Sequence, residues 1–400
     1  MKHLRFPIVI VCLLGVLLQP LAAASSAPEK KTDRSPGAAM ANTLSTVTGV
    51  AISPLLGTGA YGAYQYFTAT TPEKKAALPW FAKIGFWLPV LVIVGACAAK
   101  DSLGAILPPG MKKPLDVLET VENKASGLVA AGAVIPLSVD ALSKLIVAHS
   151  QAPGLASSGF ASIQVGVLHL SWVLDILTVP FGIAVFLVVW MASHAINVLI
   201  LLSPWGAVDA ALKGARTGLL GLLTLTATIN PWVGAALSLV VILVAYLVAG
   251  WAFRLTVFGS IFCWDFLTVR KHRYAVSPGN DRLFTGAKLT ELKVPIRTYG
   301  TLGRSSNEGH WVFAFRPWLV GARKEVEVAS QGTEIGAGAF VSTLRDSSGT
   351  FFILPPRFRD HEQELVSAYG VPGGVQPAGL RKAWSALIEL FTGRARPQAA

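Results

Sequence analysis

One long apolar stretch constrains the fold of this chain more than any other feature. Residues 231–253 read PWVGAALSLVVILVAYLVAGWAF and contain no side chain that is ionised near neutral pH. At about 1.5 Å of rise per residue, a helix of this length extends roughly 34 Å, which exceeds the bilayer's hydrocarbon thickness of about 30 Å. Since backbone amides in hydrocarbon must bond to one another, the stretch predicts a membrane-spanning helix.

The composition agrees with this interpretation. Of the 400 residues, 52% are hydrophobic and 14% are charged, whereas about a quarter of an average globular chain is charged. Residues 180–202 and 80–99 are two further apolar runs. Weaker candidate spans are residues 44–68, 125–149 and 207–230.

We therefore expect residues 43–269 to form a membrane α-helical bundle of about five crossings plus one re-entrant helix. Either 44–68 crosses and 207–230 is re-entrant, or the reverse holds. The loop after the 80–99 run contains four lysines, which favours the reverse because cytoplasmic loops are rich in Lys and Arg.

The first residues have the pattern of a secretory signal. Lys2 and Arg5 precede an apolar run that ends at Leu18, and three alanines at 22–24 offer a small-residue cleavage site. This predicts a signal peptide over residues 1–24. Residues 25–42 are polar and are expected to be a disordered tether.

From Val276 the pattern changes to short segments of alternating polarity. Strands are expected at 311–316, 325–328, 339–344 and 350–354, separated by turns rich in Ser, Asn and Gly. A helix over 357–369 ends before Gly370, a residue suited to a C-terminal cap. We expect residues 276–370 to form a small antiparallel β-domain closed by a C-terminal helix, with the outline of a pleckstrin-homology-like roll.

Residues 371–400 combine a Pro/Gly linker with an amphipathic helix near 378–392. Trp384 lies on its apolar stripe, and Arg381 and Lys382 lie on its basic side. This pattern is typical of a helix that lies on an anionic bilayer. The alternative is a terminal helix packed on the β-domain.

The charge distribution predicts location and partners. The formal net charge is +12, and the basic cluster 270–273 follows the longest apolar run. Such a cluster favours a cytoplasmic C-terminal domain, in a multi-pass protein of the bacterial inner membrane. The expected partners are the lipid bilayer, with anionic lipids favoured, and an unidentified protein; nucleic acid is not favoured.

No catalytic, cofactor or metal site is predicted, because phosphate-binding and metal-binding motifs are absent and Cys12, Cys97 and Cys263 form no bridgeable pair. The candidate functional residues are polar side chains at membrane depth. Such groups are either functional or hydrogen-bond between helices. They are Asp140 and Lys144, which lie four residues apart, together with Asp175, His194 and Asn197.

Residues 48–136 carry four features in order: TGVAISPLLGTGAYGAY from Thr48, Lys100-Asp101, PLDVLETV from Pro114 and SGLVAAGAV from Ser126. With these features the segment resembles an uncharacterised bacterial integral-membrane domain family. That family has no assigned activity. The resemblance therefore implies a bacterial membrane protein and no particular reaction.

These observations favour a membrane-anchored scaffold or interaction protein with a cytoplasmic β-domain. The alternative is a transporter or channel for a small solute or lipid, supported by Gly- and Pro-broken helices and by the polar residues at membrane depth. An intramembrane enzyme ranks third, because only Asp175 and His194 support it.

Overall fold

The computed structural model describes residues 36–104, 109–150, 161–202, 206–306, 309–338, 341–377 and 379. The predicted signal peptide and the amphipathic helix near 378–392 lie outside these residues, so both remain predictions. Of the expected tether, residues 36–42 are helical. The chain divides into two compact units, Met1–Ala252 and Phe253–Ala400, which we call the helical unit and the sheet unit.

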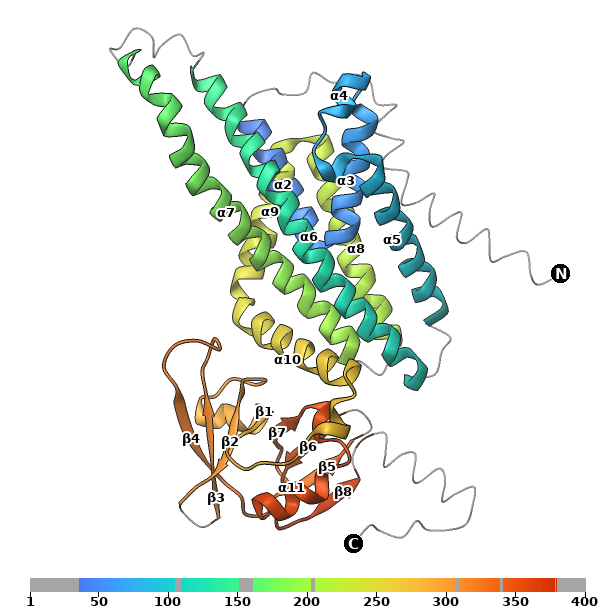
Figure 1. The fold of residues 1–400 in the computed structure, drawn as a ribbon, viewed down its shortest axis with the longest axis vertical. Coiled ribbons are helices and arrows are strands. Elements are labelled where there is room, and N and C mark those ends of the chain that lie inside the picture. The colour runs from blue at the N-terminus through green and yellow to red at the C-terminus, as the bar shows by residue number, and fades with distance from the viewer. Residues whose placement is uncertain are drawn as a thin grey trace, which may run out of the picture. The chain divides into compact units, whose positions relative to one another are not determined.

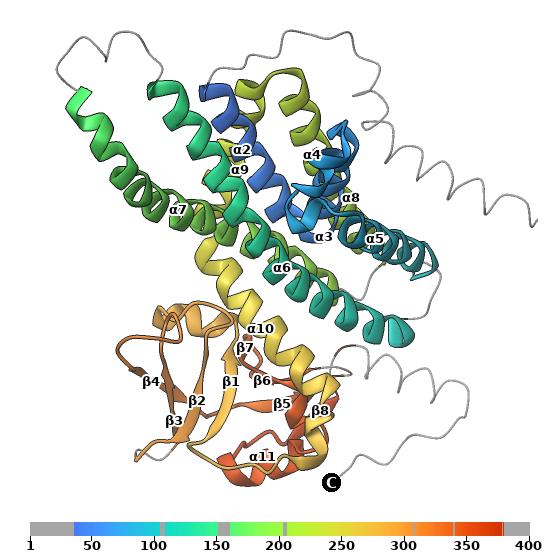
Figure 2. The same cartoon turned by 45° about the horizontal axis from the view of Figure 1, so that its top comes forward.

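The helical unit is built around helix α2, which packs against α3, α6, α7, α8 and α9. Figures 1 and 2 both show α6 and α7 side by side over much of their length. The helices are α2 (Pro36–Ile52), α3 (Pro54–Thr68), α4 (Pro72–Ala76), α5 (Ile84–Gly104), α6 (Pro109–Ser150), α7 (Ala161–Leu202), α8 (Gly206–Ile229), α9 (Pro231–Leu247) and the start of α10 (Ala249–Leu267), with the 3₁₀ turn η1 (Trp80–Ala82).

The apolar core of the helical unit is made of small and branched side chains. Val47, Val50 and Ala51 of α2 meet Phe186 and Val189 of α7, and α6, α8 and α9 contribute one or two further residues each. Small side chains let helix axes approach closely, so that van der Waals contacts hold the unit together.

The expectation of about five membrane crossings was wrong. Within the described residues, one helical segment, Pro180–Leu202, is long and apolar enough to cross a membrane. The number rises to two only if the bent pair formed by α9 and α10 is taken as one span. Multi-pass insertion is therefore not supported.

Three of the expected membrane spans, all within the described residues, are absent from the structure for local reasons. The 44–68 run is interrupted at Ser53, which separates α2 from α3. In α5 only Ile84–Cys97 is apolar, and that segment is too short to cross. The 231–253 stretch breaks at Val248, where the two helices bend by 68°.

The remaining helices differ from the expected spans in length and charge. Helix α8 is unbroken, and its first half contains ionised side chains, so it is neither a clean span nor re-entrant. Helices α6 and α7 each contain 42 residues. The segment up to Lys124, expected to be a loop with a short helix in its later part, is thus largely the start of α6. Pro180, the first residue of the 180–202 run, lies inside α7.

The sheet unit contains eight strands in the order β4-β3-β2-β1-β7-β6-β5-β8. All neighbours are antiparallel except β5 and β8, which are parallel. The expected purely antiparallel domain was therefore wrong. The strands are β1 (Asp281–Thr285), β2 (Tyr299–Arg304), β3 (His310–Phe315), β4 (Lys324–Ala329), β5 (Glu334–Ala337), β6 (Ser342–Arg345), β7 (Thr350–Leu354) and β8 (Val375–Pro377).

Short helices complete the sheet unit. They are η2 (Arg270–Arg273), η3 (Ala287–Leu292), η4 (Pro356–Phe358) and α11 (Glu362–Tyr369). Gly370 caps α11 in the left-handed conformation (φ 64°), as its position in the sequence predicts.

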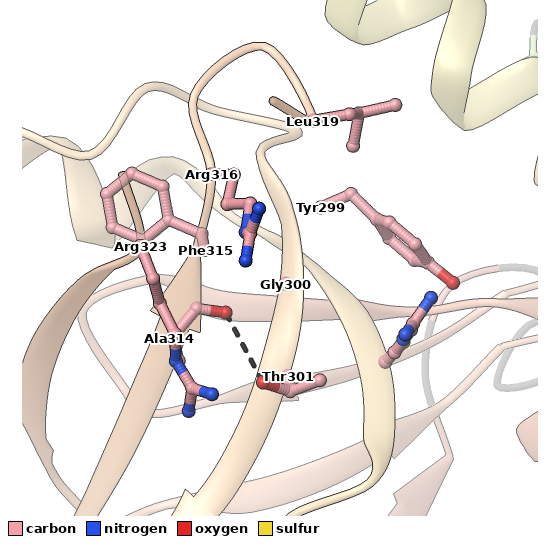
Figure 3. A pocket seen from close by; sticks show the side chains of 9 residues that line it. Tyr299, Gly300, Thr301, Ala314, Phe315, Arg316, Leu319 and Arg323 are labelled. Carbon is pink, nitrogen blue, oxygen red and sulfur yellow. Dashed lines mark hydrogen bonds between the residues drawn. The ribbon is translucent and has the colours of Figure 1, made fainter. Parts of the chain in front are cut away.

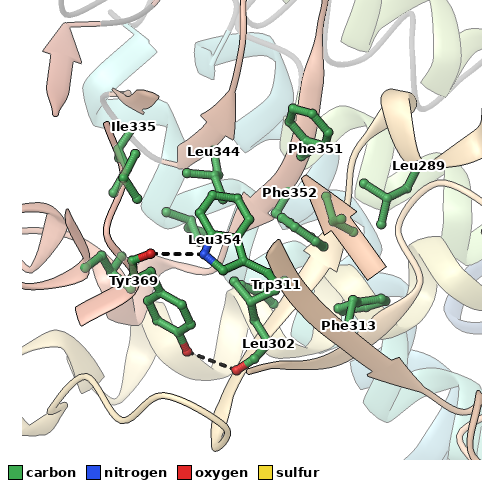
Figure 4. Packing of buried hydrophobic residues seen from close by; sticks show 14 of the residues in the cluster. Leu289, Leu302, Trp311, Phe313, Ile335, Leu344, Phe351, Phe352, Leu354 and Tyr369 are labelled. Carbon is green, nitrogen blue, oxygen red and sulfur yellow. Dashed lines mark hydrogen bonds between the residues drawn. The ribbon is translucent and has the colours of Figure 1, made fainter. Parts of the chain in front are cut away.

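The core of the sheet unit is aromatic. Trp311, Phe313 and Phe352 are almost fully buried, and the rings of Phe313 and Phe352 lie 5.2 Å apart. The indole of Trp311 donates to the carbonyl of Tyr369 at 3.0 Å, which ties β3 to the end of α11 (Figure 4). Trp311, Phe313 and Phe315 alternate along β3 and are all buried, so the alternation in the sequence predicts the inward face of this strand correctly.

A buried carboxylate fixes the first strand. Asp281 accepts hydrogen bonds from the hydroxyls of Tyr274 (2.5 Å) and Tyr369 (2.7 Å) and from the amide of Ser277 (3.0 Å). Burial, followed by the bond to Asp281, raises the pKa of both tyrosines, so they remain donors across the physiological range. This arrangement is structural, since every group in it is bonded within the core.

Helix α10 joins the sheet unit from Phe253 onward. The ring of Phe258 lies 4.8 Å from that of Phe284 in β1. Near its end, Asp265 pairs with Arg357 of η4 at 2.6 Å, and both side chains are buried. Arg270 lies 3.6 Å from the second oxygen of the same carboxylate.

We predict that Asp265→Asn destabilises the sheet unit by about 3–5 kcal/mol, because it leaves the Arg357 guanidinium buried without its counter-charge. Replacing both partners, as Asp265→Leu with Arg357→Met, should recover most of the loss. Urea unfolding of the purified chain, monitored by amide hydrogen exchange in the sheet strands, measures the loss of stability in the single variant and its recovery in the double variant. As a control, Lys271→Ala breaks the exposed pair with Asp360 and should cost under about 1 kcal/mol.

Candidate functional site

A network of polar side chains joins α6, α7 and α8 inside the helical unit. Its centre is His194, whose side chain is fully buried and whose Nδ1 lies 2.9 Å from Oδ1 of Asn123. The Asn123 amide oxygen can only accept, so Nδ1 carries the proton in this bond. The pair therefore fixes both the tautomer and the orientation of the imidazole.

Two further contacts extend the network toward α8. Arg216 donates to Oδ1 of Asn197 at 2.5 Å, and Lys213 pairs with Glu119 at 2.8 Å. Asn197 is almost fully buried, whereas Glu119 and Lys213 are partly exposed. Each helix thus supplies at least one partner to another, and the bonds fix the rotation of all three.

Aromatic packing encloses one side of the imidazole. The Trp190 ring stacks on His194 with centroids 5.3 Å apart and planes inclined by 16°. On α6, Gly127 makes room for Trp190, because a Cβ there would collide with the indole nitrogen. The site is therefore polar toward Asn123 and apolar toward the indole.

Two polar atoms of the network face inward without a hydrogen-bond partner. They are Nε2 of His194 and Nδ2 of Asn197, both buried. With Nδ1 protonated, Nε2 is an acceptor, and the amide nitrogen is a donor. Nε2 can therefore accept a proton or a hydrogen bond, and among the described residues of the network no nucleophile is paired with a neighbouring base.

The structure brings together only some of the predicted residues. His194 and Asn197 belong to one network. Asp140 and Lys144 lie on α6 and Asp175 lies on α7, but their side chains are outside those that the structure describes. Trp384, Arg381 and Lys382 lie outside the described residues.

Sequence reasoning missed Asn123, the partner of His194 on α6. Asp116, Thr120 and Asn123 are nearly fully buried and share one face of α6 at spacings of four and three residues. That spacing was the available signal. It was overlooked because the short helix expected here was read with Asp116, Glu119 and Glu122 together on one polar face.

The sheet unit has a separate groove with a volume of about 360 Å³ (Figure 3). Strands β1, β2 and β3 form its floor, where Arg282, Thr301 and Ala314 are aligned across the sheet. Arg316 and Arg323 add two more guanidinium groups. In the described part of the chain, no group of three or more His, Cys, Asp or Glu side chains could hold a metal ion.

Comparison of the chain with protein-family models, curated proteins and solved structures finds no match. The resemblance of residues 48–136 to an integral-membrane family and the likeness to a pleckstrin-homology roll therefore remain predictions.

We predict that His194 and Asn123 are energetically coupled. In a double-mutant cycle with His194→Ala and Asn123→Ala, the coupling should reach about 0.5–3 kcal/mol, because the two groups share a buried hydrogen bond. Thermal unfolding of the four purified proteins measures it. The matched cycle of Asn123→Ala with Leu243→Ala, an exposed position on α9, should be additive; coupling in both cycles would contradict a specific bond.

Proposed function

We propose that this chain is a membrane-anchored interaction protein, with the helical unit as the anchor and the sheet unit as the binding module. The observation that supports it most is the distribution of polarity in the helical unit. Its interior holds the His194 network, whereas much of its surface is apolar.

The exposed apolar side chains are too numerous for a surface that faces only water. Monomeric soluble proteins rarely expose large contiguous apolar patches. On the outer faces of α5, α7, α8 and α9 the large side chains at least 40% exposed are Ile84, Leu88, Val92, Ile93, Phe181, Leu187, Val208, Leu222, Leu225, Ile229, Trp232, Val233, Leu239, Val240, Leu243, Val244, Tyr246 and Leu247. Contact with a bilayer would cover part of this apolar surface without further protein.

The anchor that we propose is the segment Pro180–Leu202, with the bent α9–α10 pair as a second contact. The membrane we propose is the bacterial inner membrane. The basic turn η2 supports a cytoplasmic location for the sheet unit, because Lys and Arg near apolar helices favour that side.

The sheet unit is suited to binding. The carboxylate of the neighbouring Asp281 is already hydrogen-bonded to Tyr274 and Tyr369. The groove lined by Arg282, Arg316 and Arg323 is open to a partner. Guanidinium groups bind carboxylates and phosphates with two parallel hydrogen bonds. An anionic partner, protein or lipid, therefore fits this unit.

We predict that alkaline carbonate leaves the wild-type chain in the membrane pellet and that Leu187→Asp shifts it toward the supernatant. An aspartate at the centre of a span costs about 2.5–3.5 kcal/mol. Leu292→Asp is the matched control, since Leu292 is equally exposed (46% against 47%) but lies in the sheet unit. Complete extraction of the wild-type chain would rule out the anchor.

A second candidate function is a transporter for protons or a small polar solute. The unpartnered Nε2 of His194 and Nδ2 of Asn197 support it. In vesicles with a trapped pH-sensitive dye, a transporter should collapse an imposed proton gradient, and His194→Phe should abolish the effect. Equal proton leak in both proteins and in empty vesicles would exclude a proton pathway through this network.

A further inference from the structure

The hairpin between β3 and β4 presents an apolar tip. Trp318, Leu319 and Val320 are consecutive and are 52%, 45% and 69% exposed. Part of the Trp318 ring packs against Phe253 of α10, with the ring centroids 5.0 Å apart, and the rest of the tip is open. Exposed single hydrophobic side chains are common, but three in a row at the end of a hairpin form a small projecting surface. The segment is therefore suited to an apolar partner.

The backbone of this tip has an unusual conformation. Leu319 has a φ of 64°, in the left-handed region that branched and bulky side chains rarely adopt. Its amide nevertheless bonds to the carbonyl of Arg316 at 3.0 Å, and Gly321 follows with a φ of 85°. Strain of this kind marks positions that the surrounding structure holds for a reason.

Basic side chains surround the apolar tip. Arg316 precedes it, and Arg323 and Lys324 follow it, all three exposed. Arg323 pairs with Glu325 at 3.0 Å, but both groups are more than half exposed, so the pair is weak. Within the described residues, Arg282 and Arg316 take part in no ion pair, which leaves two guanidinium groups ready to bind an anion.

The groove lies directly beside the tip. Leu319 lines it together with the arginines, and Figure 3 shows Arg316 between Phe315 and Tyr299 with Leu319 at one end. The volume of about 360 Å³ accommodates a small ligand group. An anionic group in the groove and an apolar layer around the tip would thus be engaged at the same time.

We propose that the groove and the β3–β4 hairpin together bind an anionic lipid at the bilayer surface. The phosphate headgroup lies against Arg282 and Arg316, and Trp318, Leu319 and Val320 enter the interfacial layer. Tryptophan favours that layer, and each basic residue near an anionic surface strengthens attachment. This proposal rests on the membrane anchoring proposed above, which would hold the sheet unit close to a bilayer.

Other occupants fit less well. A free phosphate would use the arginines but leave the apolar tip in water. A purely apolar partner would leave Arg282 and Arg316 unpaired. Only a surface that is anionic outside and apolar just beneath satisfies both parts.

The test uses the full-length chain in nanodiscs of phosphatidylcholine alone or with phosphatidylglycerol. Hydrogen exchange of the amides in residues 318–324 reports docking. We expect slower exchange in anionic discs. Arg282→Gln with Arg316→Gln should weaken docking about fivefold per arginine. The control, Lys293→Gln with Arg359→Gln, removes the same charge from exposed positions outside the groove and should keep the protection.

Each other outcome is decisive. Equal protection in neutral and anionic discs, or none in either, overturns the headgroup site. Protection that inorganic phosphate produces in neutral discs identifies a soluble anion site and also overturns it. Failure of the chain to enter discs of any composition refutes the membrane anchor instead, so the two proposals fail in distinguishable ways.

Discussion

The helical unit depends on one constraint: polar side chains inside it must bond to one another, because the surrounding side chains are apolar. A buried polar group without a partner costs free energy comparable to a lost hydrogen bond. The bonds from His194 to Asn123 and from Arg216 to Asn197 meet most of this requirement across three helices, and Nε2 of His194 and Nδ2 of Asn197 are the atoms of the network without a partner. Sliding any of these helices by one turn would break the bonds, so the network specifies the packing that the apolar core merely stabilises.

A comparable rule governs the sheet unit. The buried Asp265–Arg357 pair joins the end of α10 to η4, and the aromatic contact of Phe258 with Phe284 joins its middle to β1. Breaking such a pair is costly, whereas replacing both partners is often neutral. The pair therefore explains why the C-terminal end of α10, an apolar helix, packs as part of the sheet unit.

Sequence reasoning recovered local features better than the arrangement in space. The alternation in Trp311–Arg316 predicted β3, because a half-buried strand alternates, and the short apolar run Thr350–Leu354 between turns predicted β7. It missed β1, β2 and β8, which are short or interrupted by glycine. Apolar length predicted too many spans, because a break such as that at Val248 depends on packing and has no strong signal in a run of aliphatic residues.

The candidate site was predictable only in part. His194 and Asn197 could be identified because polar groups are rare in an apolar run. Their partners on α6 and α8 are separated from them by up to 71 residues along the chain, so only the fold reveals the contacts. The groove was not predictable, since Arg282 and Arg316 become neighbours only through the registers of three strands.

The two edge strands of the sheet, β4 and β8, are protected by different means from pairing with another strand. At one margin, β4 alternates charged side chains, Lys324, Glu325 and Glu327, with its inward residues, and charges discourage pairing with a foreign strand. At the other, β8 covers β5 and is only three residues long. A natural or proteolytic form cut before Val375 would therefore uncover the backbone of β5 and acquire a tendency to self-associate through this margin.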